Sequence, residues 1–247
     1  MKIAIIVKTA ITNSKVYTVH KNKVTYHTNN LFLSQTDKAA IEFALSWIEK
    51  NGGTVDAYTF EKGMLADRVL HETLAMGVDN AIKFSEVDIN DPLQVNYITN
   101  QFINYIQKNK KDYDLILSGY NTNSDMFSAY IAQKLDYFYY DYVSAIDTNF
   151  NYESSLEKGK IRGQYKLPAV ISVLDTINNP HLPSFVKLHN ALTTPITDIK
   201  VKKNNNDDES QIIANQKKHK KIIFDMNKDP NSVQELVDLL KDDGILK

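Results

Sequence analysis

The chain has 247 residues, a formal net charge of −1 and 43% hydrophobic residues, and it contains no cysteine. This length and composition suit one large α/β domain or two small ones with a sizeable core. The balanced charge argues against nucleic acid as the main partner. The absence of cysteine excludes disulfides, cysteine-ligated zinc or iron–sulfur centres and a cysteine nucleophile.

The first eight residues contain an apolar run that predicts a first strand at residues 3–7. The run is too short for a signal peptide or a membrane-spanning helix, and no other segment approaches the length of a span. We therefore expect a soluble, cytoplasmic protein with no membrane span.

Strands and helices are predicted to alternate after this first strand. Residues 16–26 alternate between apolar and polar on both sides of a polar turn, which indicates a hairpin. Apolar patterns then predict, in order, a helix capped by Ser34 or Thr36 and ended at residues 51–53, a strand at 55–60, a helix from Ala66 to Gly77, a strand at 81–84 and a helix opened at residues 91–92. This alternation is typical of a parallel sheet with crossover helices.

The stretch 114–135 joins a buried strand, a glycine, a polar loop and a helix. Residues 115–117 form a continuous apolar run, Gly119 allows a sharp turn, and apolar residues recur at helical spacing from Phe127 to Leu135. In an open α/β sheet such a loop lies at the carboxyl end of a strand, where ligands bind, and the helix start offers free N–H groups to a phosphate. A polar surface turn without a ligand fits the same residues.

The second half of the chain has a different pattern. Three strands, predicted at residues 142–148, 160–165 and 169–174, add antiparallel or mixed strands to the sheet. A polar linker follows, and a short amphipathic helix begins at Asn231 or Ser232. Such a helix needs this domain or another chain to cover its apolar face. We therefore predict an α/β domain at 1–200, and at 201–247 a linker and C-terminal helical arm that packs on a partner subunit.

The sequence offers no set of catalytic residues. The six histidines stand at no metal-ligand spacing, which predicts no metal site. A G-x-S-x-G elbow, a P-loop and a G-x-G-x-x-G fingerprint are all absent, and no nucleophile is paired with a base. These observations favour a binding module over a hydrolase.

Several separated blocks resemble the β subunit of electron transfer flavoprotein. They lie, in order, at residues 7–8, 37–45, 71–79, 114–135, 167–171, 179–191 and 232–241. The most specific are the Ala-Met-Gly sequence that ends at Gly77 and the Leu-Pro-Ala-Val sequence that begins at Leu167. Their order and spacing agree with the family over nearly the whole chain.

The resemblance implies a mostly parallel Rossmann-like fold of the adenine nucleotide alpha-hydrolase type, with a C-terminal arm that wraps onto an α subunit. It implies an electron carrier rather than an enzyme. The heterodimer would hold one FAD, mainly in the α subunit, and this subunit would bind AMP, or a second FAD as in electron-bifurcating members. The complex would carry electrons from a flavin-containing dehydrogenase to an acceptor.

The resemblance also assigns residues. The cofactor-binding set would be Ile6, Lys8, Ser34, Thr59, Phe60, Gly119, Asn121, Thr122, Asn123, Ser124, Asp125 and Ser128. In this assignment, main-chain groups beside Ile6 and Phe60 read adenine, while the loop and helix start hold phosphate. The dehydrogenase would dock on the segment 180–191, through Phe185 as an apolar anchor together with Leu182, Val186 and Leu188.

Departures from the family pattern concern the ligand more than the fold. The family loop reads close to G-x-Q-x-x-D-G-D-T-G-Q-V-G-P, whereas here it is about three residues shorter and has Asn121 and Asn123 in place of aspartates. The family arginine after Pro180 is His181. The alternative hypothesis is a stand-alone adenine-nucleotide-binding regulatory protein of the universal stress type, whose terminal helix would pack on its own chain.

Overall fold

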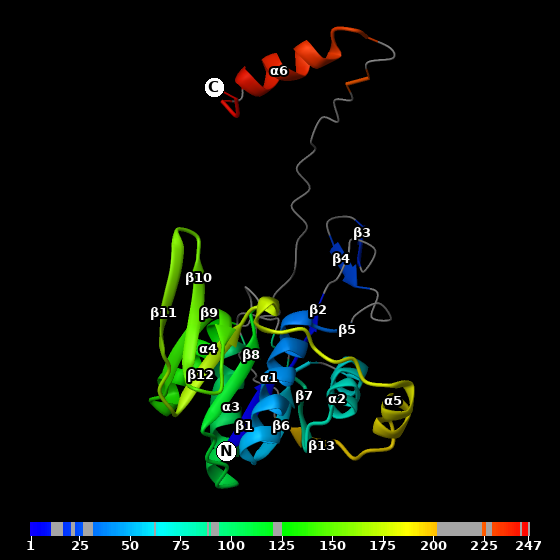
Figure 1. Ribbon diagram of the computed structural model, residues 1–247. Helices are drawn as coiled ribbons and strands as arrows, with labels where there is room; N and C mark the ends of the chain where they lie inside the picture. Colours follow the sequence, from blue (N-terminus) through cyan, green and yellow to red (C-terminus); the bar gives the residue numbers. More distant parts are fainter. Residues whose placement is uncertain are drawn as a thin grey trace.

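A nine-stranded sheet forms the centre of the described part of the chain (Figure 1). The computed structural model describes residues 1–10, 17–20, 23–26, 32–61, 63–87, 89, 94–120, 125–201, 224–225, 229–242 and 244–246. The strand order is β11-β10-β9-β12-β8-β1-β6-β7-β13. These strands are β1 (Lys2–Ile6), β6 (Thr54–Thr59), β7 (Asn80–Ser85), β8 (Leu115–Gly119), β9 (Phe138–Ile146), β10 (Asn151–Leu156), β11 (Gly159–Gln164), β12 (Ala169–Val173) and β13 (Thr197–Lys200).

Most of this sheet is parallel. Every neighbouring pair from β9 through to β13 runs parallel, and only the β9–β10 and β10–β11 pairs are antiparallel. The helices are α1 (Gln35–Asn51), α2 (Met64–Met76), α3 (Val95–Lys108), α4 (Asp125–Leu135), α5 (Phe185–Ala191) and α6 (Ser232–Asp242). The predicted α/β class with crossover helices is confirmed.

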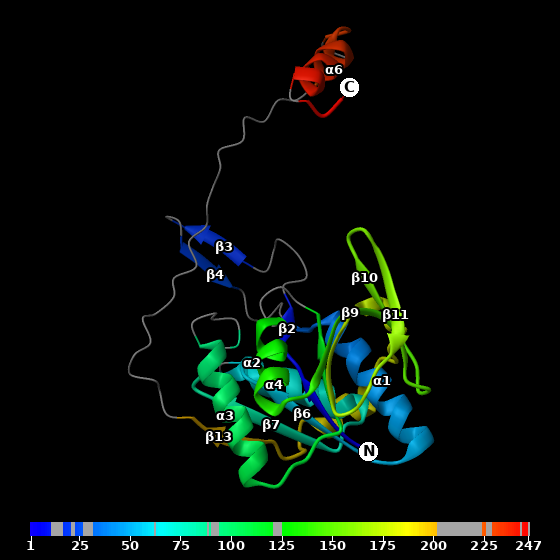
Figure 2. The same cartoon turned by 90° about the vertical axis from the view of Figure 1, so that its left-hand side faces the viewer.

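The helices cover both faces of the sheet, so the core has two halves. The alternating side chains of β1 show the division, because Ile3 and Ile5 pack with α1 and α2, whereas Ala4 and Ile6 pack with α3 and α4. Figure 2 shows α3 and α4 side by side, on one face of the sheet. The central strands are buried on both faces, which explains why their sequences are apolar runs rather than alternating patterns.

Several predictions of elements are confirmed and others need correction. The hairpin is present as β3 (Tyr17–His20) and β4 (Lys23–Tyr26), and a small pair of strands, β2 (Thr9–Ala10) and β5 (Phe32–Leu33), was not expected. The last strand of the second half is not an antiparallel addition, because β12 returns to lie parallel between β8 and β9. The strand β13 and the helix α5 were missed, since they are short and largely exposed, and β10 was missed because its sequence Asn-Tyr-Glu-Ser-Ser-Leu has no apolar pattern.

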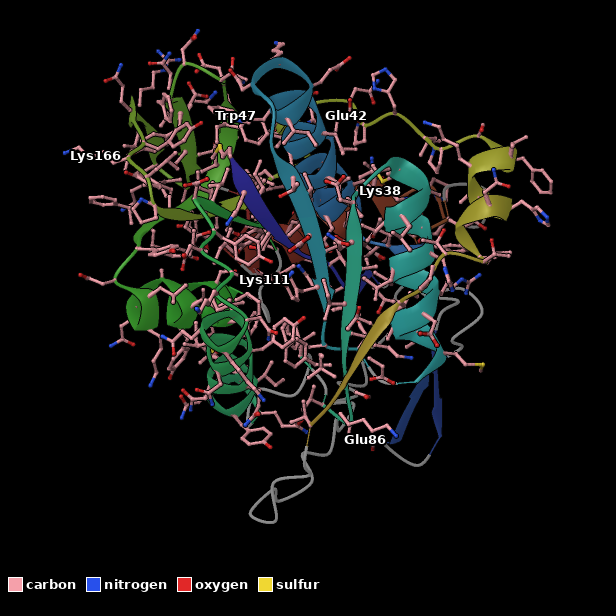
Figure 3. All side chains as sticks on the ribbon, turned by 90° about the horizontal axis from the view of Figure 1, so that it is seen from below. Lys38, Glu42, Trp47, Glu86, Lys111 and Lys166 are labelled. Carbon is pink, nitrogen blue, oxygen red and sulfur yellow. The ribbon has the colours of Figure 1, made fainter. Side chains whose placement is uncertain are left out.

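A buried polar network lies on the α3/α4 side of β6. The carboxylate of Asp56 accepts hydrogen bonds from Lys111 Nζ at 2.6 Å, from Asn80 Nδ2 at 2.7 Å and from the hydroxyl of Tyr113, which also contacts the hydroxyl of Tyr58. Lys111 is labelled in Figure 3. Burial by itself raises the pKa of Asp56, but these hydrogen bonds and the charge of Lys111 together hold it below its ordinary value of 3.8.

The network makes stability depend on pH. Because the folded pKa of Asp56 is lowered, the network stabilises the fold above the unfolded pKa, and this contribution is lost as the pH falls from about 4 through the folded value. We expect Asp56→Asn to lower the free energy of unfolding by about 2 kcal/mol at pH 7, and by less at pH 3. Urea titrations at both pH values test this, and an equal loss at both would contradict it.

Candidate functional site

The carboxyl ends of β1 and β8 meet at the point where the sheet order reverses. From β1 the chain proceeds outward through β6 and β7, and α3 then carries it back across β1 to β8 on the other side. In open α/β sheets ligands bind at such a switch point. Lys8 follows β1 and Gly119 ends β8, so two residues of the predicted cofactor-binding set stand at this position.

One carboxylate ties the two strand ends to α1. Asp37 is fully buried, and its Oδ2 accepts from the main-chain N–H of Lys8 at 3.0 Å while its Oδ1 accepts from that of Gly119 at 2.8 Å. The Lys8 Nζ, also fully buried, lies 3.4 Å from Asp37 Oδ1 and donates to the Gly119 carbonyl at 2.8 Å. We call these three residues the switch-point knot. The ammonium group of Lys8 therefore already has two hydrogen-bond acceptors within the chain, Asp37 Oδ1 and the carbonyl of Gly119.

Gly119 is needed for close packing rather than for a turn. A β-carbon at this position would stand 2.4 Å from Thr36 Oγ1 and 2.5 Å from both the main-chain nitrogen and Oδ1 of Asp37. Its backbone is not in the left-handed region, so the expected turn conformation is not the reason for glycine. The space beside its α-carbon is filled by the start of α1 and does not cradle a ligand.

Ser34 and Ser128 have hydrogen-bond partners within the chain. Ser34 is the N-cap of α1, where its hydroxyl accepts from the N–H of Asp37 at 3.0 Å, as its position before the helix predicted. Ser128 is buried in α4, and its hydroxyl lies 2.8 Å from that of Ser118 on β8. These two serines fix helices to the strand ends.

Three further members of the predicted set lie on β1 and at the end of β6. Ile6 and Phe60 are core side chains on the α3/α4 face, and the Phe60 ring packs 4.9 Å from the Phe127 ring. The Phe60 carbonyl, expected to read adenine, accepts from the N–H of Ile89 at 3.0 Å. Thr59 differs, because its hydroxyl is buried and has no partner within the described part of the chain. That hydroxyl is a polar atom for which a ligand would supply the missing hydrogen bond.

The rest of the predicted loop falls outside the described residues. Asn121, Thr122, Asn123 and Ser124 belong to this segment, and Asp125 is described only as the first residue of α4. The adjoining residue Tyr120 was not predicted as part of the site. Its ring lies 4.5 Å from that of Tyr142 on β9, a residue whose backbone has a positive φ of 52°.

The predicted docking residues are on the surface. The helix α5 is capped by Ser184, and Leu182, Phe185, Val186 and Leu188 around it are exposed, with Phe185 at 82%. This exposure excludes a core role for Phe185. The sequence did not predict that these residues begin a helix, since seven residues are too few to show a periodicity.

The apolar face of α6 is also exposed. Of the predicted apolar face, Val233 and Leu236 are exposed and Val237 and Leu240 are half-buried, while the neighbouring Leu239 is also exposed. The helix α6 lies away from the sheet in Figures 1 and 2. The helix begins at Ser232, one of its two expected first residues, and the buried hydroxyl of Ser232 has no hydrogen-bond partner among the described residues. The carboxylate of Asp229 accepts from the N–H of Asn231 at 2.9 Å.

A groove in the described part of the chain lies away from the switch point. It has a volume of about 560 Å³ and is lined by residues of β9, β10 and β11 such as Ala145, Tyr152 and Arg162. In the described part of the chain, no group of three or more potential ligands is arranged to hold a metal ion. Nor does any helix within the described ranges have the length and apolar character needed to cross a membrane.

Two comparisons with known proteins identify the family of the chain. The family described as electron transfer flavoprotein domain matches residues 22–204, about three quarters of the chain. The electron transfer flavoprotein subunit beta of Bacillus subtilis (strain 168) is 24% identical over 208 residues, which cover 81% of this chain and 79% of that protein. The chain therefore belongs to the electron transfer flavoprotein family, as a member of its β-subunit branch.

Proposed function

We propose that this chain works with an electron transfer flavoprotein α subunit as a cytoplasmic electron carrier. The complex takes electrons from a flavin-containing dehydrogenase and passes them to an acceptor. The FAD, held mainly by the α subunit, supplies the redox chemistry. This chain contributes the docking surface, the contact with the α subunit and a nucleotide site, and it has no catalytic residue of its own. The family membership supports this function.

The exposed apolar face of α6 is the observation that carries the heterodimer. A helix of eleven residues is marginal in water by itself and owes its stability to the burial of its apolar face. Leu236 and Leu239 on that face are exposed, so a second polypeptide is needed to cover them. The stand-alone regulatory alternative expected this helix to pack on its own chain, and no such packing is observed among the described residues.

We also propose that the carboxyl edge beside Thr59 holds an adenine nucleotide, either AMP or a second FAD. The unpartnered buried hydroxyl of Thr59 supports this site, since it fits a hydrogen bond from or to a ligand. Lys8 is bound within the knot and Ser128 is bound to Ser118, so neither is free to hold a phosphate. The loop 121–124 and the start of α4 would bind the phosphate.

The substitution Thr59→Val tests whether the hydroxyl of Thr59 binds a ligand or stabilises the fold. In the ligand-free protein we expect unchanged or slightly higher stability, by up to about 1 kcal/mol, because the substitution removes an unsatisfied polar group. The amount of AMP or FAD retained on purification should fall severalfold, as measured by chromatography after heat extraction. The control is Thr73→Val, whose hydroxyl bonds within α2 to Val69. Unchanged nucleotide content in Thr59→Val would contradict the site.

Phe185→Ala tests the docking surface. Loss of a large exposed apolar anchor should weaken docking by about 2 kcal/mol, and so lower the rate of electron delivery from the dehydrogenase at low concentration roughly thirtyfold. Flavin content should be unchanged, because the side chain contacts solvent rather than the core. Leu156→Ala, an exposed apolar change on β10, serves as the control. Loss of flavin together with the rate would show that the segment is structural.

A further inference from the structure

The segment that leads into α5 is tied to α1 by three hydrogen bonds. Asn178 Nδ2 donates to the carbonyl of Ala39 at 2.8 Å. His181 contacts both oxygens of Glu42, with its main-chain N–H at 3.2 Å from Oε2 and its Nδ1 at 2.7 Å from Oε1. A carboxylate only accepts, so Nδ1 carries the proton in this contact. In Figure 3 the yellow chain that leads into α5 passes beside the labelled Glu42.

The other end of α5 is held by a second histidine. His71 on α2 has its Nδ1 2.8 Å from the carbonyl of Ala191, the last residue of the helix, and Ala191 is itself buried. Because a carbonyl only accepts, this Nδ1 also carries the proton. The residues between the two histidine contacts are exposed, including Phe185 and Val186. The docking segment is thus held at both ends, and between them α5 packs against α2 while most of its side chains stay exposed.

The lysine closest to Glu42 along α1 is already paired with another carboxylate. On α1, Lys38 is one turn earlier and pairs with Glu72 of α2 at 2.8 Å. The other titratable or charged groups on these elements are Asp37, Glu49 and Lys50 on α1, Asp67, Arg68 and His71 on α2, Asp175 in the turn before the segment, and Lys187 and His189 on α5. The side chain of Glu42 is 16% exposed and that of His181 91% exposed, so the pair is anchored on the α1 side and open to solvent on the other.

We propose that His181, Glu42 and His71 are positioning residues that present α5 to its docking partner, and that the His181–Glu42 contact tightens when His181 is protonated. The proposal rests on the proposed docking function of this segment. Histidine normally changes charge between about pH 5 and pH 8, and a hydrogen bond between two charged groups is stronger than one to a neutral imidazole. The chain has histidine where the family pattern has arginine, which is charged throughout this range.

Hydrogen exchange of the full chain in complex with its α partner tests whether His181, Glu42 and His71 hold the docking segment, and it needs no dehydrogenase. The amides of residues 178–191 are followed at pH 6 and pH 8 in the wild type, His181→Arg, His181→Gln and Glu42→Gln. At pH 6 we expect exchange to be roughly two- to fivefold faster in His181→Gln and Glu42→Gln than in the wild type, as suits an exposed pair. His181→Arg should match the wild type at pH 6 and exchange more slowly than it at pH 8. His71→Gln should speed exchange near Ala191 at both pH values.

The apparent KM of the dehydrogenase for the carrier complex then tests whether these three residues position the docking surface. The ratio of the wild-type KM to that of His181→Arg should rise about two- to fivefold between pH 6 and pH 8, with kcat unchanged. Because both values are measured with the same dehydrogenase, any effect of pH on the dehydrogenase itself cancels in this ratio. A KM ratio that does not change with pH, or hydrogen exchange that is the same in every variant, would contradict the positioning role of these residues. If Phe185→Ala leaves electron delivery unchanged while exchange responds as expected, the docking function fails and the contact itself stands.

Discussion

Asp37→Asn is expected to lower the free energy of unfolding by about 3–5 kcal/mol, because it leaves the buried ammonium of Lys8 without its anion. The same substitution weakens the two main-chain hydrogen bonds that join Lys8 and Gly119 to α1. Urea unfolding followed by circular dichroism measures the loss. The double variant Lys8→Met, Asp37→Asn should recover part of it, since no buried charge remains. Stability of the single variant within 1 kcal/mol of the wild type would contradict the role given to the knot.

Gly119→Ala should cost about 3 kcal/mol or more, and it should lower the content of bound nucleotide. The added β-carbon would collide with the main chain of Asp37, which cannot move without displacing the start of α1. Gly159→Ala is the matched control, because this glycine stands in β11 with open space around its α-carbon and no positive φ. Equal unfolding free energies for the two alanine variants would mean that α1 does not press on β8 as described.

The central fold could be predicted from the sequence because the buried strands and the main helices carry strong local patterns. The apolar run at β8 and the helix capped by Ser34 were predicted from such patterns, and both are confirmed. The position of β12 could not be predicted, because Ala169–Val173 reads as a buried strand whichever neighbour it pairs with. The exposed helix α5 and the polar strand β10 leave little apolar pattern to detect.

The proximity of Lys8 and Gly119 could be predicted from the sequence, whereas the side-chain contacts between them could not. The resemblance brought Lys8 and Gly119 to the same place, and the structure joins them. Asp37, which ties them together, stood inside a matched block and was given no role, because only the fold shows that its carboxylate faces both strand ends. The place of Lys8 in the nucleotide site stays a prediction, while the structure shows that its ammonium contacts Asp37 and the carbonyl of Gly119.

The most direct test of the heterodimeric electron carrier is the native mass and cofactor content of the chain purified with an electron transfer flavoprotein α subunit. We predict a stable one-to-one complex that is yellow and releases FAD, and that dissociates when Leu236 and Leu239 are both changed to aspartate. A colourless complex without extractable flavin or adenine nucleotide would contradict this function, and so would a chain that stays monomeric and does not bind the α subunit.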